Sequence, residues 1–229
     1  MKFVLIFLIT YFIGNISASY LVSKAFYNED IREKGSGNAG TTNVLRNYGF
    51  KYALMTFLID FLKGTLAAFI GSKIDPEFGA YIAGVSVVLG HVWPVVLKFK
   101  GGKGVATTAG VYLFTDYRIF LVQFILFISI NILGRLVSLT SLIISVLATS
   151  LVVLLHSGNT YFIIMSLINS LLIFYKHKDN IKRLRAGTES RLALDKLKPK
   201  KGKKYENRNS WKRKLGNSYG LQLIKKTRY

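Results

Sequence analysis

Long uncharged apolar runs are the feature that most restricts how this chain can fold. Residues 3–13, 119–130, 142–155 and 161–175 contain no charged side chain. With their flanks, these runs are long enough to cross a bilayer as helices. A soluble domain with a hydrophobic content of 51% would spread its charges along its helices, whereas this chain gathers them into short stretches. The pattern predicts an all-α, polytopic membrane protein.

The apolar segments predict a bundle of seven transmembrane helices. They are expected at residues 2–22, 52–70, 79–97, 105–114, 119–133, 136–155 and 161–175. A cleavable signal peptide is the alternative for the first segment, because Lys2 precedes an apolar core. We expect a retained helix, since the apolar run continues past Ser19.

The basic residues predict the orientation of the bundle. All 32 lysines and arginines except Lys2, Lys63, Lys73 and Arg118 lie in residues 23–51, 98–104, 134–135 or 176–229. With seven spans these stretches share one side of the membrane, which the positive-inside rule assigns to the cytoplasm. The N-terminus is then outside and the C-terminus is cytoplasmic, in a multi-pass protein of the cell membrane.

The composition changes after the last apolar segment. We expect residues 1–192 to form the integral membrane domain and residues 193–229 to form a basic, disordered cytoplasmic tail. The charge of the tail suits contact with anionic lipid headgroups. It would also attract nucleic acid nonspecifically. The other basic residues lie beside glycines at helix ends, so we expect no nucleic-acid partner.

Residues 35–46, GSGNAGTTNVLR, have the composition of an anion-binding loop. Glycines let backbone N–H groups approach a ligand closely, and the hydroxyl and amide side chains add short donors. Arg46 adds a planar fork that suits a phosphate or a carboxylate. The structural alternative is a polar turn before a helix that Thr42 or Asn43 caps.

Two further stretches on the same predicted side combine glycine with basic residues. They are KFKGGKG at residues 98–104 and HKDNIKRLRAGTE at residues 177–189. A Walker A motif is excluded, because that motif needs Ser or Thr after its lysine and Lys103 is followed by Gly104. Together the three stretches predict a site for anionic groups at the cytoplasmic face.

Two charges and a proline interrupt the predicted spans. Asp60 and Lys63 lie one helical turn apart, and charges at membrane depth normally pair inside the bundle. We expect a structural ion pair first, and a role in ordering the site second. Pro94 is expected to bend the third span. The chain has no cysteine, which excludes a thiolate nucleophile and cysteine metal ligands.

Three motifs resemble those of the bacterial acyl-phosphate:glycerol-3-phosphate acyltransferase family. They are SGNAGTTNVLR (36–46), GHVWPVVLKFKGGKGVAT (90–107) and HKDNIKRLRAGTE (177–189). The DFLKG sequence at residues 60–64 is also similar to that family. The resemblance runs in order from the first helix to about Leu192 and leaves out the tail.

The resemblance implies a reaction and a place for it. An acyl group moves from acyl phosphate to the sn-1 hydroxyl of glycerol 3-phosphate, which yields lysophosphatidate and phosphate for phospholipid biosynthesis. It implies seven transmembrane helices, a site at the cytoplasmic face, and neither a cofactor nor a metal.

The resemblance also implies roles for individual residues. Those that bind the acyl phosphate are Ser36, Gly37, Asn38, Thr42, Asn43, Arg46 and Ser141. Those that bind glycerol 3-phosphate are Lys103, His177, Asn180 and Arg183. Supporting positions are His91, Gly101, Gly102, Gly104 and Glu189. The residues expected to carry catalysis are Ser36, Arg46, Lys103, His177 and Asn180.

Two questions stay open at this point. The hydroxyl proton is accepted either by His177 or by the phosphate of the substrate. The His-x4-Asp signature of another glycerolipid acyltransferase class is absent, since no aspartate follows any of the three histidines at that spacing.

The alternative function is a membrane transporter or channel for an anionic solute, which predicts basic residues at the bilayer midplane.

Overall fold

The computed structural model describes residues 1–192, all within the compact unit Met1–Leu197, and the predicted tail lies outside them. Every regular element of this part is helical. The elements are α1 (Lys2–Gly14), α2 (Ala18–Tyr27), η1 (Ile31–Glu33), α3 (Thr41–Tyr48), α4 (Phe50–Ile74), α5 (Gly79–Val92), η2 (Val95–Leu97), α6 (Val105–Thr115), α7 (Tyr117–Gly134), α8 (Val137–Leu155), α9 (Thr160–Lys176) and α10 (Lys178–Arg185). The all-α prediction is confirmed for the described residues.

Five segments within residues 1–192 are long and apolar enough to cross a membrane. They are Lys2–Tyr27, Phe50–Ile74, Gly79–Leu97, Tyr117–Gly134 and Val137–Leu155. The other two predicted segments form shorter apolar helices, α6 and α9. The polytopic class therefore holds, while the number of seven spans stays a prediction.

The first segment differs from the continuous helix expected at residues 2–22. It consists of α1 and α2, which are separated where Ser17 takes an extended conformation. Asn15 lies in this break, and its side-chain amide donates to the carbonyl of Tyr11 at 2.8 Å. The break releases backbone groups from the helical pattern, and the carbonyl oxygen of Ile16 instead accepts a hydrogen bond from Lys63 at 2.6 Å.

Two other local predictions are corrected. The polar stretch at residues 23–51 is not a plain loop, because it contains the end of α2, then η1 and α3. Pro94 does not bend a continuous third helix. Instead α5 ends at Val92, and Pro94 is the N-cap of the short 3-10 helix η2. Proline has no N–H to continue the helical ladder, so a new element begins there.

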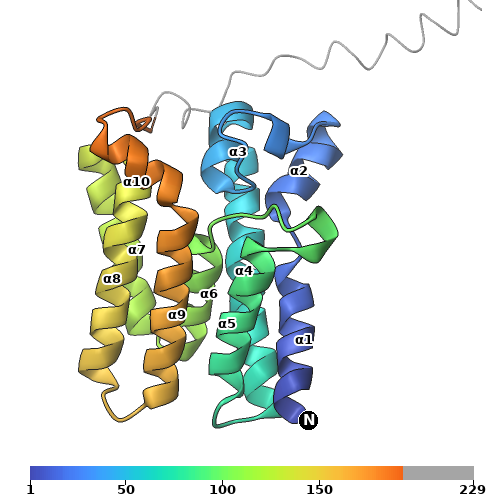
Figure 1. Ribbon diagram of the computed structural model, residues 1–229, viewed down its shortest axis with the longest axis vertical. Helices are drawn as coiled ribbons and strands as arrows, with labels where there is room; N and C mark the ends of the chain where they lie inside the picture. The colour runs from blue at the N-terminus through green and yellow to red at the C-terminus, as the bar shows by residue number, and fades with distance from the viewer. Residues whose placement is uncertain (193–229) are drawn as a thin grey trace, which may run out of the picture. The chain divides into compact units, whose positions relative to one another are not determined.

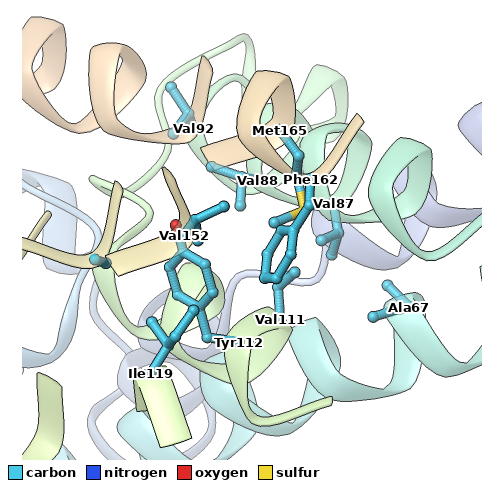
Figure 2. Close-up of a cluster of buried hydrophobic side chains, with 12 residues drawn as sticks. Ala67, Val87, Val88, Val92, Val111, Tyr112, Ile119, Val152, Phe162 and Met165 are labelled. Atoms are coloured by element: carbon cyan, nitrogen blue, oxygen red, sulfur yellow. The ribbon is translucent and has the colours of Figure 1, made fainter. Parts of the chain in front are cut away.

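A buried apolar cluster holds the helices together (Figure 2). It draws side chains from all six helices from α4 to α9, among them Ala67, Val87, Tyr112, Val152 and Phe162. Glycine brings α4 and α6 close together, since a Cβ on Gly64 would lie only 2.1 Å from the carbonyl oxygen of Thr107. Such small-residue contacts are typical of helices packed in a membrane.

The helices place the motif-bearing segments at one end of this unit. Figure 1 shows α2, α3 and α10 at the end opposite Met1. We call these the α10 end and the Met1 end. The backbone N–H of Leu192 donates to the carbonyl of Arg135 at 2.6 Å, so the last described residues are fastened at the α10 end too.

Candidate active site

A single large cavity collects the predicted site residues. Its volume is about 1510 Å³, and α3, the loop at residues 98–104, the start of α8 and α10 contribute to its lining. Every site residue predicted from the sequence lines it, except Gly102. Gly102 belongs to the 98–104 loop but packs against the ring of His91.

The first loop takes its shape from Asn43. This side chain is 1% exposed, and its amide nitrogen donates to the carbonyls of Lys34 and Asn38 at 2.9 and 3.0 Å. Its amide oxygen accepts from the backbone N–H of Ser36 at 3.1 Å. A helix does follow this loop, as the structural alternative expected, but Gly40 rather than Thr42 or Asn43 is its N-cap. The Asn43 side chain thus stabilises the conformation of the loop through hydrogen bonds to its backbone. The position of Asn43 in the motif does not reveal this role.

Arg46 lies in the last turn of α3, on the cavity wall. Its guanidinium donates to the backbone carbonyl of Ser190 at 3.3 Å. This bond links the first motif to the residue that directly follows the third motif, across 144 residues of sequence. Ser36, Gly37, Asn38 and Thr42 line the same wall of the cavity.

The second loop brings Lys103 to the third motif. Gly104 follows with a φ of 87°, which suits glycine, and serves as the N-cap of α6. The ammonium of Lys103 donates to the side-chain oxygen of Asn180. Burial lowers the pKa of Lys103 to about 8, although the Glu189 carboxylate acts in the opposite direction. An anionic ligand would stabilise this partly desolvated cation.

Glu189 organises the third motif. One carboxylate oxygen accepts from Ser138 at 2.9 Å and from the Asn180 amide at 2.7 Å. The other oxygen accepts from the guanidinium of Arg183 at 2.7 Å. These hydrogen bonds, from Asn180 and Arg183 foremost, lower the pKa of Glu189 although burial raises it. The carboxylate therefore fixes the groups around Lys103 rather than facing a substrate as a free acid.

His177 lies at the junction of α9 and α10, where it is 2% exposed. Its Nδ1 lies 2.8 Å from the carbonyl oxygen of Ile173, which only accepts hydrogen bonds, so Nδ1 carries the proton. Burial and the neighbouring Lys103 ammonium lower the pKa of His177 to about 4. The imidazole is therefore neutral at physiological pH and has a lone pair on Nε2.

Ser141 is buried one helical turn below Ser138 and lines the cavity. Its hydroxyl donates to the carbonyl of Val137 at 2.8 Å, which leaves its oxygen to accept. Ser138, the partner of Glu189, was not assigned a role from the sequence. Asn131 was also missed, although it lines the cavity and is 6% exposed. It gave no signal because it is an isolated amide in an apolar run, as is Gln123, which also lines the cavity and was missed as well.

The part of the cavity that faces α4, α6, α7 and α8 is mainly apolar, although Gln123 and Asn131 of α7 also line the cavity. Phe57 of α4, Ala109 of α6, Phe124 and Ile128 of α7, and Ile144 of α8 line it. The side chains of Phe124 and Ile128 are each 44% exposed, so this part borders the outer surface of the bundle. The cavity thus joins a cationic upper part to an apolar lower part. In the described residues, no group of three His, Cys, Asp or Glu is arranged to hold a metal ion.

Comparisons with known proteins show what the chain is similar to. The glycerol-3-phosphate acyltransferase family model matches residues 4–187. A glycerol-3-phosphate acyltransferase of Alkaliphilus metalliredigens is 45% identical over 82% of this chain and 95% of its own length. One from Clostridioides difficile is 40% identical over 85% of this chain and 98% of its own length.

Two crystal structures are also similar to the chain. Both are described as PlsY (YgiH), an integral membrane glycerol 3-phosphate acyltransferase. The glycerol 3-phosphate form has a TM-score of 0.80 and 34% identity, and covers 87% of this chain and 100% of that one. The lysophosphatidic acid form has a TM-score of 0.77 and 32% identity, over 86% and 98% of the two chains.

Proposed function

The chain belongs to the glycerol-3-phosphate acyltransferase family, and from this premise we propose that its cavity transfers an acyl group from acyl phosphate to the sn-1 hydroxyl of glycerol 3-phosphate. The observation that carries this proposal is the cavity with cationic groups at one end and an apolar lining at the other. Acyl phosphate needs both, because it joins a phosphate to a hydrocarbon chain. Glycerol 3-phosphate needs only the polar end.

The glycerol 3-phosphate subsite is built around Lys103. The ammonium is held by Asn180, which is in turn held by Glu189, so the cation is oriented before a substrate enters. Arg183 supplies a second positive group beside the same carboxylate. His177 offers an uncharged Nε2 acceptor to a glycerol hydroxyl, since its Nδ1 donates to Ile173.

The acyl-phosphate subsite consists of the first loop and Arg46. Ser36, Gly37, Asn38 and Thr42 surround the phosphoryl group, and Asn43 keeps their loop in shape. The acyl chain enters the apolar part of the cavity between α4 and α7. Ser141 contributes a buried oxygen near the boundary of the two parts.

The reaction then needs no covalent enzyme intermediate. The sn-1 hydroxyl oxygen attacks the acyl carbonyl carbon, the bond from that carbon to the phosphate oxygen breaks, and phosphate leaves. Donors aimed at the phosphate stabilise the charge that develops on it. Holding the hydroxyl against the carbonyl supplies a further advantage through orientation.

The hydroxyl proton goes to the leaving phosphate rather than to His177. A phosphate group has a second pKa near 6. The pKa of His177 is lowered to about 4, so its imidazole is the weaker base. His177 is accordingly a hydrogen-bond acceptor that orients the hydroxyl, and its removal should impair binding of glycerol 3-phosphate more than it removes a base.

We also infer that seven segments are embedded in the membrane, with α6 and α9 beside the five long ones, and that the site faces the cytoplasm. The basic stretches near α3, the 98–104 loop and α10 support this orientation through the positive-inside rule. The same positions argue against a transporter. The cavity's cations Arg46, Lys103 and Arg183 lie at the α10 end rather than at a midplane break.

The test uses the purified full chain in detergent. We expect phosphate release from acyl phosphate that depends on glycerol 3-phosphate, with lysophosphatidate as the product. Asn180→Ala should raise the KM for glycerol 3-phosphate and leave that for acyl phosphate nearly unchanged. Ser36→Ala should affect acyl phosphate or kcat instead. No glycerol 3-phosphate-dependent release would refute the reaction, and the opposite pattern of KM changes would refute the subsites.

A further inference from the structure

Three buried polar groups form a network at the wall of the cavity, where Asp60 and His91 line it, and none of the three has a part in the reaction proposed above. Asp60, Lys63 and His91 are 2%, 5% and 6% exposed, on the facing helices α4 and α5. The ammonium of Lys63 donates to Asp60 Oδ1 at 2.7 Å, to the carbonyl of Ile16 at 2.6 Å, and to His91 Nδ1 at 2.9 Å. All three ammonium hydrogens are therefore used.

The third contact determines the state of the histidine. An ammonium group has no lone pair, so His91 Nδ1 must accept the hydrogen bond and the ring proton lies on Nε2. Asp60 Oδ1 lies 3.5 Å from the same Nδ1. The network thus fixes both the tautomer and the orientation of the imidazole.

The other edge of this imidazole supports the second loop. A Cβ on Gly102 would lie 2.2 Å from His91 Nε2 and 2.7 Å from the carbonyl oxygen of Ala39 in the first loop. The backbone N–H of Gly102 donates to the carbonyl of His91 at 3.1 Å. Gly102 is consequently enclosed between His91 and the first loop, and the next residue is Lys103.

We propose that Asp60, Lys63 and His91 are positioning residues that hold the Gly102 backbone and thereby set Lys103 for glycerol 3-phosphate. This inference rests on the proposed role of Lys103. A purely structural pair would need only Asp60 and Lys63, and burying two charges is costly even when they are paired. Here Lys63 also contacts His91, and His91 contacts the second loop at Gly102. Through these contacts the ion pair affects the position of the loop at the site.

The main test replaces the ion pair with uncharged groups of similar size. The variant Asp60→Asn/Lys63→Met leaves no unpaired buried charge, so it has the best chance of folding. We expect the Kd of glycerol 3-phosphate, measured by calorimetry on the purified full chain, to rise about tenfold, because small misplacements at a site are costly. The KM for acyl phosphate should change less than about twofold.

A matched control and a coupling test separate positioning from general damage. The control Lys2→Met/Asp75→Asn removes the ion pair at the other end of α4 and should leave both constants unchanged. In a Lys103→Met background, the Asp60→Asn/Lys63→Met change should have almost no further effect on the Kd, since coupled sites are non-additive. Full additivity would contradict the proposal.

A second variant keeps the proposal testable if the first does not fold. His91→Asn retains an amide oxygen close to the Nδ1 position, so Lys63 stays satisfied, but it removes the ring edge beside Gly102. We expect the same rise in the Kd of glycerol 3-phosphate. A folded His91→Asn or ion-pair variant with the wild-type Kd would overturn the inference, whereas a wild-type chain that binds no glycerol 3-phosphate would instead overturn the proposed function.

Discussion

At the Met1 end of the bundle Asp116 accepts 2.7 Å hydrogen bonds from both Arg118 and His156, whereas at the α10 end Lys103 donates to the uncharged amide of Asn180. The side chain of Asp116 is 4% exposed, so its charge is satisfied inside the protein. Lys103 is half-buried, and it lines a large cavity. The direct ion pairs of Asp116 suit a structural role. A cation that lines a cavity, such as Lys103, is suited to bind an anion.

The connections between helices also differ between the two ends, in their length and in their glycines. The connections at the Met1 end between α4 and α5, α6 and α7, and α8 and α9 are short. At the α10 end, the connections from α2 to α3 and from α5 to α6 are longer and include Gly37 and Gly104 with positive φ, whereas residues 135–136 alone join α7 to α8. The comparison predicts that substitutions at the α10 end change kinetics and that those at the Met1 end change stability.

The largest effect is expected for Arg46→Lys. Lysine keeps the positive charge but loses the planar fork that can bind phosphate with two hydrogen bonds. We expect kcat to fall by the equivalent of about 2–4 kcal/mol, by analogy with the removal of one transition-state donor. The measurement is steady-state kinetics with a melting curve as control. Activity near that of the wild type would remove Arg46 from the phosphate subsite.

The next effect concerns pH at Lys103. Because the pKa of Lys103 is lowered to about 8, its ammonium loses its proton as the pH rises through that value. The kcat/KM for glycerol 3-phosphate should therefore decline above about pH 8. Lys103→Arg should abolish this decline, since a guanidinium stays charged. A constant kcat/KM up to about pH 9.5 in the wild type would contradict the assignment.

A smaller effect, and one on stability alone, is expected for Asp116→Asn at the Met1 end. The loss of hydrogen bonds to a charged group should lower the free energy of unfolding by about 1.5–3 kcal/mol, with kcat and both KM values unchanged. Hydrogen bonds from Arg118 foremost, and from His156, lower the pKa of Asp116. Its stabilisation is thus present above the ordinary carboxyl pKa of 3.8 and is lost as the pH falls toward the lowered value. A lower kcat or a higher KM in this variant would contradict the prediction that the Met1 end affects stability alone.

The smallest effect is expected for deletion of residues 196–229, which lie outside the described residues and outside the family match at 4–187. The described chain already completes the cavity, so kcat and both KM values in detergent should not change. Binding to anionic vesicles should weaken, by at most about 1 kcal/mol per basic residue near the surface. A folded but inactive deletion variant would mean that the site extends into the tail.

The sequence predicted the helices, and the gathering of the three motifs at one end, better than the internal contacts. Apolar runs have a length set by the bilayer, so α7, α8 and α9 were expected within about two residues of their ends. The three motifs brought their residues to one cavity because they follow each other on one side of the bundle. Asn43 was different, since nothing in a polar stretch distinguishes a side chain that binds a ligand from one that folds the loop.

Contacts between distant residues account for most of the remaining differences. Lys63 was expected to pair with Asp60, and it does. Its contacts with Ile16 and His91 depend on how α1, α4 and α5 pack, which no local pattern records. The helix break before Ser17 was missed for the same reason, because its cost is offset by a residue on another helix.

The break in the first segment also bears on how the protein is made. The carbonyl of Ile16 finds its partner in Lys63, 47 residues later in the chain. During synthesis the first segment therefore reaches the bilayer with an unsatisfied carbonyl, and Lys63, whose charge pairs with Asp60 of its own helix, emerges with N–H donors that still lack partners. Each removes the penalty of the other, so we expect these first two segments to enter the membrane as a pair rather than one after the other.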